Sequence, residues 1–216
     1  MSIVLETKNL CGKFTSLMNG LLLDPQKLDD KIQKKLHALE TIYRRWNKNL
    51  NLVSKQDDAA IWERHILDSL QIIPFFNDVN KLADMGAGVG LPSLPLAIAR
   101  PDIDFFAIEP IQKKCTLMQE IIREIRIPNF HVLTERVEKV YLSHMDVVCC
   151  RAFGEFYRDA RLAYKMLKPQ GHFITFKTQP HSEVPEGYEK VESHDYVLPG
   201  IPRKYYVIVA TKAGEA

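Results

Sequence analysis

The sequence predicts an α/β protein: a doubly wound, mostly parallel sheet of seven strands in residues 71–216, with a helical extension in residues 1–70 packed on it. From Lys81 onward, short apolar strands alternate with helical segments, which is the pattern of a parallel sheet with right-handed crossovers. Three glycines stand between the first of these strands and the helix that follows. The last two strands follow each other directly, which is typical of a sheet that includes one antiparallel strand.

The N-terminal extension reads as helices. An amphipathic helix is predicted within residues 5–20. Asp24 and Pro25 indicate a helix start, with the aspartate as the cap and the proline in the first turn. From Leu28 onward, apolar residues recur at helical spacing, which predicts a long helix that runs to about Asn47.

A second helical segment, residues 61–70, carries a polar pair. His65 and Asp68 are three residues apart, so they can hydrogen-bond along one helix face. A histidine and an aspartate also occur in nucleophilic catalysis, but no suitably framed serine or cysteine accompanies them here. We interpret them as a buried polar pair that ties the helical extension to the sheet.

Strands and helices alternate through the rest of the chain. Residues 135–140 are predicted to be a short helix or a loop. The predicted strands are residues 81–85, 104–108, 130–133, 146–150, 172–176, 188–197 and 205–210, and the predicted helices between them are residues 91–99, 111–126 and 156–167.

Composition excludes several classes of protein. No apolar run approaches the roughly 20 residues of a membrane span, and no signal-peptide core begins the chain, so a cytoplasmic protein is expected. The four cysteines form no metal-binding spacing, so we expect reduced thiols and no metal. The net charge of +2 is too small to indicate a nucleic-acid partner by itself.

The glycine-rich turn is the clearest binding motif. Gly86, Gly88 and Gly90 alternate between a strand and a helix, where they permit positive φ and leave the backbone bare. The first turn of the next helix presents free N–H groups to a polar ligand. The spacing is G-x-G-x-G instead of the dinucleotide fingerprint G-x-G-x-x-G, which disfavours a nicotinamide-binding oxidoreductase and favours S-adenosylmethionine. Glu109 ends the second strand, where its carboxylate can accept hydrogen bonds from both ribose hydroxyls.

Several stretches together resemble one family, the bacterial RsmG methyltransferases, also called glucose-inhibited division protein B. The combination is specific, although each stretch alone is not. The sequence departs from the family pattern at Ser93, where glycine is usual, and at Pro110, where serine often follows the carboxylate. The matching stretches are Trp46-Asn47 through Asn51-Leu52-Val53-Ser54, Arg64-His65-Ile66-Leu67-Asp68-Ser69, residues 84–95, Arg136-Val137-Glu138, Arg151-Ala152-Phe153 and Lys177.

The resemblance implies a class I S-adenosylmethionine-dependent fold and methyl transfer to N7 of a guanine in 16S ribosomal RNA or the small subunit. Nothing in the sequence demands more than a monomer, so a monomer is expected. The resemblance also implies that Arg151 is the catalytic residue and a cofactor contact. Because N7 carries no proton, we expect Arg151 to position groups, not to act as acid or base. The other cofactor-binding residues that it implies are Gly86, Gly88, Gly90, Leu91, Glu109, Val137 and Glu138.

Two other functions stay open at this point: a methyltransferase that acts on another substrate, and a non-catalytic RNA-binding factor. For RNA, a phosphate-binding surface of basic side chains is expected. Whether free RNA, the small subunit or an assembly intermediate is the substrate is open as well. The candidate phosphate contacts are Arg44, Arg45, Lys48, Arg64, Arg123 and Arg203, with Lys177 near the mouth of the cleft.

Overall fold

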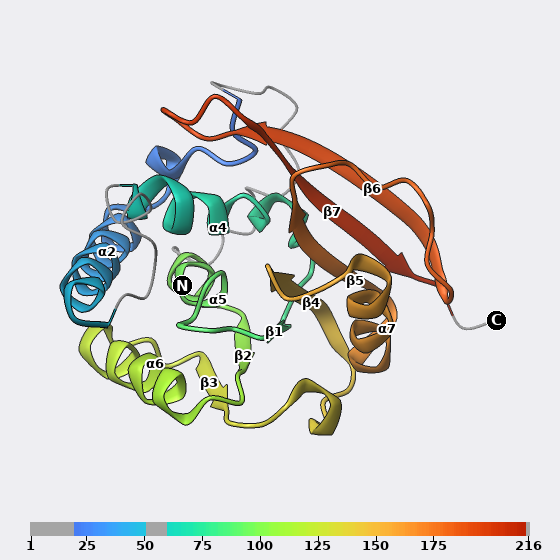
Figure 1. Cartoon of the computed structure of the whole chain (residues 1–216), viewed down its shortest axis with the longest axis horizontal. Helices are drawn as coiled ribbons and strands as arrows, with labels where there is room; N and C mark the ends of the chain where they lie inside the picture. Colours follow the sequence, from blue (N-terminus) through green and yellow to red (C-terminus); the bar gives the residue numbers. More distant parts are fainter. Residues whose placement is uncertain (1–19, 51–59, 215–216) are drawn as a thin grey trace.

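A seven-stranded sheet forms the centre of the computed structural model, which describes residues 20–50 and 60–214 (Figure 1). The strand order is β3-β2-β1-β4-β5-β7-β6. Strand β7 pairs antiparallel with both of its neighbours, and the other pairs are parallel. The strands are β1 (Lys81–Met85), β2 (Asp104–Ile108), β3 (Phe130–Leu133), β4 (Met145–Arg151), β5 (Leu167–Lys177), β6 (Tyr188–Val197) and β7 (Lys204–Lys212). The predicted fold class is confirmed.

The helices cover both faces of this sheet. Figure 1 shows α6 near the β3 end of the sheet and α7 beside β4 and β5. None of the helices in the described residues is long and apolar enough to cross a membrane. The helices are α2 (Asp30–Leu50), the π-helix η3 (Trp62–Leu67), α4 (Asp68–Leu70), α5 (Ser93–Ala99), α6 (Gln112–Ile125) and α7 (Phe156–Met166), with short 3₁₀ turns at Pro25–Lys27, Ile73–Phe75 and Val137–Lys139.

Side chains that alternate between the two faces of the sheet form two apolar cores. Leu82 packs with α2, α4, α5 and α6, whereas its neighbour Ala83 packs on the opposite face with α7. Successive side chains of a strand point to opposite faces, so each buried strand contributes to both cores. The long helix α2 belongs to the first core through its buried residues Leu36 and Leu39. The helical extension is therefore continuous with the body that carries the sheet.

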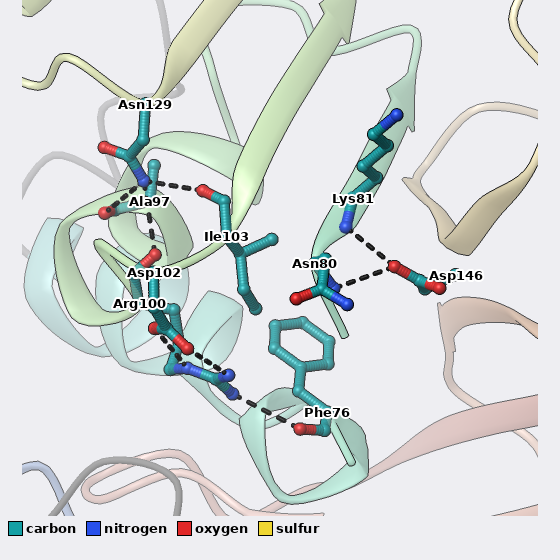
Figure 2. Close-up of polar contacts among 9 residues, drawn as sticks. All are labelled: Phe76, Asn80, Lys81, Ala97, Arg100, Asp102, Ile103, Asn129 and Asp146. Atoms are coloured by element: carbon teal, nitrogen blue, oxygen red, sulfur yellow. Dashed lines mark hydrogen bonds and ion pairs between the residues drawn. The ribbon is translucent and has the colours of Figure 1, made fainter. Parts of the chain in front are cut away.

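Two buried polar side chains, Asn129 and Asp146, make hydrogen bonds to the backbone at the edge of the sheet where the parallel strands begin (Figure 2). The amide of Asn129 donates to the carbonyls of Ala97, Arg100 and Ile103 at 2.8–3.2 Å, which satisfies the end of α5. Asp146 accepts the backbone N–H groups of Asn80 and Lys81 at 2.7 and 2.8 Å. These bonds fix the starts of β1 and β4, whose other ends carry the candidate site.

Several element boundaries match the prediction, most of the others differ by one or two residues, and the start of β5 differs by more. Strands β1, β2, β3 and β6 have the predicted bounds. Helix α5 begins two residues late, because the left-handed Gly90 (φ +91°) delays the helix. Strand β5 begins at Leu167, the last residue of the predicted helix, instead of at His172, and the register with β4 shifts between Met145 and Val147. The helix predicted within residues 5–20 lies outside the described residues.

Candidate cofactor and substrate site

The turn between β1 and α5 is a bend of bare main chain. Gly86, Gly88 and Gly90 have φ values of +71°, +61° and +91°, as their predicted role requires. The N–H groups of Gly86 and Ala87 donate to the carbonyl of Ile108 at 2.9 and 3.0 Å, which ties the bend to β2. A Cβ placed on Gly88 would meet only the carbonyl oxygen of Gly86, at 4.0 Å. The bend is therefore open above Gly88 and can accept a ligand against its backbone.

Glu109 connects this bend to the loop after β2. Its Oε2 accepts the N–H of Gly88 at 2.9 Å, and its Oε1 accepts the N–H of Ile111 at 3.0 Å. Lys114 lies 3.9 Å from Oε2. Each carboxylate oxygen can accept more than one hydrogen bond, so the buried carboxylate retains acceptor capacity for hydroxyl groups. The structure thus places an acceptor beside the open part of the bend.

The last part of the turn is closely packed. A Cβ on Gly90 would lie 2.3 Å from Cδ1 of Leu94, so glycine is required for α5 to approach. Leu91 follows and is 9% exposed. From α2, the Tyr43 hydroxyl donates to the carbonyl of Val89 at 2.9 Å, which holds the outer side of the turn. The helical extension therefore supports the bend directly.

Asp84 lies beneath the turn, fully buried at the end of β1. Burial raises the pKa of its carboxyl to about 6, and the nearby Ser93 and Cys149 groups act in the opposite direction. Ser93, where the family resemblance expects glycine, is also fully buried. The serine is accommodated beside the carboxyl without an exposed hydroxyl in the turn.

Arg151 ends β4 at the same edge of the sheet as the glycine turn. Its Nη1 donates to Oδ2 of Asp68 at 3.0 Å and to the carbonyl of Arg64 at 3.3 Å, and its Nη2 lies 3.3 Å from Nδ1 of His65. The other oxygen of Asp68 accepts the hydroxyl of Tyr196 at 2.5 Å. The guanidinium is therefore held by the helical extension and, through Asp68, by the distant strand β6.

This arrangement changes the interpretation of the polar pair His65 and Asp68. The sequence suggested a bond between them at helical spacing, and the structure shows that both side chains contact Arg151. Residues 62–67, which carry His65, form a π-helix. Burial raises the pKa of Asp68, and the charge of Arg151 opposes that shift. The expected tie between extension and sheet therefore runs through a buried ion pair.

Val137 and Glu138 form a short turn beyond β3. Val137 is 7% exposed, whereas Glu138 is exposed. Oε1 of Glu138 lies 3.4 Å from Nη2 of Arg158, and the Arg158 guanidinium lies over the ring of Phe153, 5.7 Å from its centroid. These contacts link the turn after β3 to the segment that follows Arg151.

The candidate phosphate-binding residues are dispersed over several elements. Arg44 pairs with Glu40 at 2.7 Å and Arg45 with Glu124 at 2.8 Å. Lys177 donates to the carbonyl of Gly154 at 3.1 Å, so this lysine lies at the segment after β4. Arg64 reaches Arg151 through its backbone carbonyl, and the side chain of Lys48 lies outside what the structure describes.

Sequence reasoning missed two residues of the site. Tyr196 lies 128 residues from Asp68, so no local pattern signals their hydrogen bond. Phe153 is part of the Arg-Ala-Phe motif, but only the structure shows its contact with the glycine turn: a Cβ on Gly86 would lie 2.4 Å from Cδ2 of Phe153.

Solved structures with the same architecture identify the fold. TrmN from Thermus thermophilus matches with a TM-score of 0.56 over 68% of this chain and 48% of that one, at 14% identity. TYW2 of M. jannaschii, solved in complex with AdoMet, matches with a TM-score of 0.54 over 72% of this chain and 79% of that one, at 20% identity. The fold is that of the class I S-adenosylmethionine-dependent methyltransferases.

Sequence comparison shows the family. The family model described as rRNA small subunit methyltransferase G matches residues 32–205. Proteins named ribosomal RNA small subunit methyltransferase G are 35% identical in Aromatoleum aromaticum (90% of this chain, 96% of that protein) and 33% identical in Xanthomonas oryzae pv. oryzae (88% and 92%). The chain belongs to the rRNA small subunit methyltransferase G family, which confirms the resemblance found in the sequence.

Proposed function

We propose that this protein transfers a methyl group from S-adenosylmethionine to N7 of a guanine in 16S ribosomal RNA. One observation carries the proposal: the turn after β1 is bare main chain, open above Gly88, with the Glu109 carboxylate beside it. Such a turn at the carboxyl end of a central strand fits a nucleoside ligand. Membership of the family supplies the nature of the substrate.

The residues present fit the cofactor. Gly86, Gly88 and Gly90 give the bend its backbone conformation, the open side at Gly88 leaves room for the methionine and ribose part of the cofactor, and Leu91 would line the end of the turn. Glu109 would accept the ribose hydroxyls with the lone pairs that its two backbone bonds leave free. Val137 would contact the adenine through its backbone N–H group, and Glu138 would contact it through its carboxylate.

Methyl transfer to guanine N7 needs little chemical participation by the side chains of this protein. When bound, S-adenosylmethionine supplies a methyl group on a sulfonium that already carries a good leaving group. Guanine N7 has an available lone pair and no proton, so no residue of this chain acts as a general base. The protein aligns the base and excludes water.

Arg151 has a positioning role in this proposal. Its guanidinium is fixed by Asp68 at 3.0 Å, so it presents a positive charge of defined orientation at the carboxyl edge of β4. A fixed cation at this edge can orient a carboxylate or a phosphate of the bound reactants. We assign to it the alignment of the reactants and no transfer of a proton.

The deciding experiment maps 7-methylguanine in 16S RNA from a strain that lacks the gene. One modified guanine should be missing in that strain and restored by the cloned wild-type chain. An unchanged modification pattern would overturn the assignment and leave a methyltransferase of another substrate or a non-catalytic RNA-binding factor. Methylation of free RNA, of the small subunit and of assembly intermediates in vitro identifies the substrate form. The proposal includes a cytoplasmic monomer, which sedimentation of the purified protein tests.

A further inference from the structure

Phe153 stands at the junction between the glycine turn and the end of β4. A Cβ placed on Gly86 would lie 2.4 Å from Cδ2 and 2.8 Å from Cε2 of Phe153. The aromatic ring is therefore in direct contact with the backbone of the bend that holds the cofactor in the proposed function. Two residues before it, Arg151 is fixed by Asp68.

The segment that carries Phe153 is held in place on both sides. Ala152 has a φ of +51°, a left-handed conformation that costs a non-glycine residue roughly 1–2 kcal/mol and that persists only where the surroundings enforce it. The carbonyl of Gly154 accepts a hydrogen bond from Lys177 at 3.1 Å. A Cβ on Gly154 would lie 2.7 Å from Oδ1 of the buried Asp159. The backbone on both sides of Phe153 is therefore held in place, which fixes the direction of the Phe153 ring.

The Phe153 ring is partly accessible to solvent, and the guanidinium of Arg158 lies over it. Phe156 and Phe173, which follow on α7 and β5, are 2% and 0% exposed, whereas Phe153 is only partly buried. The guanidinium of Arg158 lies over the Phe153 ring, 5.7 Å from its centroid. The Arg158 side chain is 58% exposed, and its pair with Glu138 at 3.4 Å is also solvent-exposed. Such a pair contributes about 0–1 kcal/mol, so a flat ligand can displace the guanidinium from the ring.

We propose that the Phe153 ring is the surface on which the target guanine stacks, in the place that Arg158 occupies here. The inference rests on the proposed function. Sequence-specific RNA recognition places splayed-out bases on aromatic side chains, and Phe153 offers a flat apolar surface directly beside the cofactor turn. A guanine on this ring lies next to the bend formed by Gly86.

The reaction itself favours an aromatic ring at this position. The bond from sulfur to the methyl carbon breaks as the bond from N7 to that carbon forms, and the positive charge passes from sulfur to the purine. No proton is gained or lost. Aromatic faces attract cations, so the ring binds the purine more strongly as charge develops on it. An interaction that strengthens in the transition state raises kcat as well as affinity.

The test compares Phe153→Leu, which keeps apolar volume but removes the ring, with Phe153→Trp, which keeps a ring. We expect Phe153→Leu to lower kcat/KM for RNA about 10- to 100-fold, the range of one lost base stack, with part of the loss in kcat. Its affinity for S-adenosylmethionine should stay within about twofold of the wild type. Phe153→Trp should keep most of the activity, and Tyr141→Ala, at a fully exposed aromatic residue, serves as the unaffected control.

A binding measurement tests the same contact without turnover. Tryptophan fluorescence of Phe153→Trp, corrected with the wild type, should be quenched more strongly by 7-methylguanosine monophosphate than by guanosine monophosphate. The inference is overturned if Phe153→Leu methylates RNA as well as the wild type, or if its affinity for the cofactor falls in parallel with its activity. If the wild type does not methylate 16S RNA but the fluorescence still prefers the methylated nucleotide, the proposed function fails and the stacking surface stands.

Discussion

The guanidinium of Arg151 donates to Oδ2 of Asp68 at 3.0 Å across 83 residues of sequence. The two side chains are 16% and 10% exposed, so most of the pair is out of water. Their contact joins the end of β4 to the helical extension. A pair in this position determines both how the extension sits on the sheet and where the positive charge at the site is directed.

Removing one partner of this pair should be costly. Asp68→Ala leaves a buried guanidinium without its carboxylate, which typically destabilises a protein by about 3–5 kcal/mol. The matched control is Glu124→Ala, which breaks a pair of similar length (2.8 Å) whose side chains are 55% and 48% exposed. The control should cost at most about 1 kcal/mol. Urea unfolding of both variants provides the comparison, and equal losses would show that the Asp68 contact is no stronger than a surface pair.

We expect methyl transfer to require the planar guanidinium of Arg151 and not only its positive charge. Arg151→Lys retains a positive charge but loses the planar group that reaches Asp68, the Arg64 carbonyl and His65 together. We expect methyl transfer to fall at least about tenfold, because a misaligned reactant is penalised steeply. Single-turnover rates with saturating cofactor give the measurement. Arg151→Ala would also lose stability because it leaves the mostly buried Asp68 carboxylate without its partner, so lysine is the more informative replacement.

Gly88 is expected to matter for the ligand more than for the fold. Its φ of +61° makes Gly88→Ala strained, by about 1 kcal/mol, while the added methyl group projects into the open space above the bend. Gly200→Ala is the matched control, because Gly200 has a φ of +72° and no atom within 4 Å of an added Cβ. Calorimetric titration should show a large loss of S-adenosylmethionine affinity only for Gly88→Ala. Similar affinities in both variants would remove Gly88 from the cofactor site.

The buried Asp84 should leave a signature in the pH dependence of stability. Its pKa is raised from 3.8 to about 6 in the folded protein, so between these values the folded state holds a proton that the unfolded state has lost. The free energy of unfolding therefore falls as pH rises through this window, by on the order of 3 kcal/mol from this group alone. Asp84→Asn has no carboxyl to titrate at this position, so its free energy of unfolding does not fall in this window. Its stability relative to the wild type should therefore increase from about pH 4 to pH 7. Parallel stability curves for the two proteins would contradict the raised pKa.

Local patterns were sufficient for the parts of the fold that short stretches determine. The glycine turn could be predicted because φ above zero and a bare backbone are properties of Gly86, Gly88 and Gly90 themselves. Strands β1 and β2 have apolar runs bounded by polar residues, and their predicted bounds are those observed. Strand β5 was predicted to start too late, because Gly171 suggests a turn in sequence but is required by the close approach of the Lys168 and Met145 carbonyls.

Contacts between distant segments could not be predicted. The bond from Tyr196 to Asp68 depends on where the hairpin of β6 and β7 crosses the helical extension, which is a property of the whole fold. The contact of Asp68 with Arg151 joins residues 83 positions apart, and residues 62–67 carry no local signal for the π-helix that they form. The contact of Phe153 with Gly86 likewise required the three-dimensional arrangement of β1 and β4.

A crystal structure of the protein with S-adenosylhomocysteine, the demethylated product, would show whether the turn after β1 is the cofactor site. We expect density for the compound along the backbone of Gly86 to Gly90, with its ribose hydroxyls within hydrogen-bond distance of the Glu109 carboxylate. Density at another place, with this bend closed by side chains, would contradict the assignment of the turn as the cofactor site.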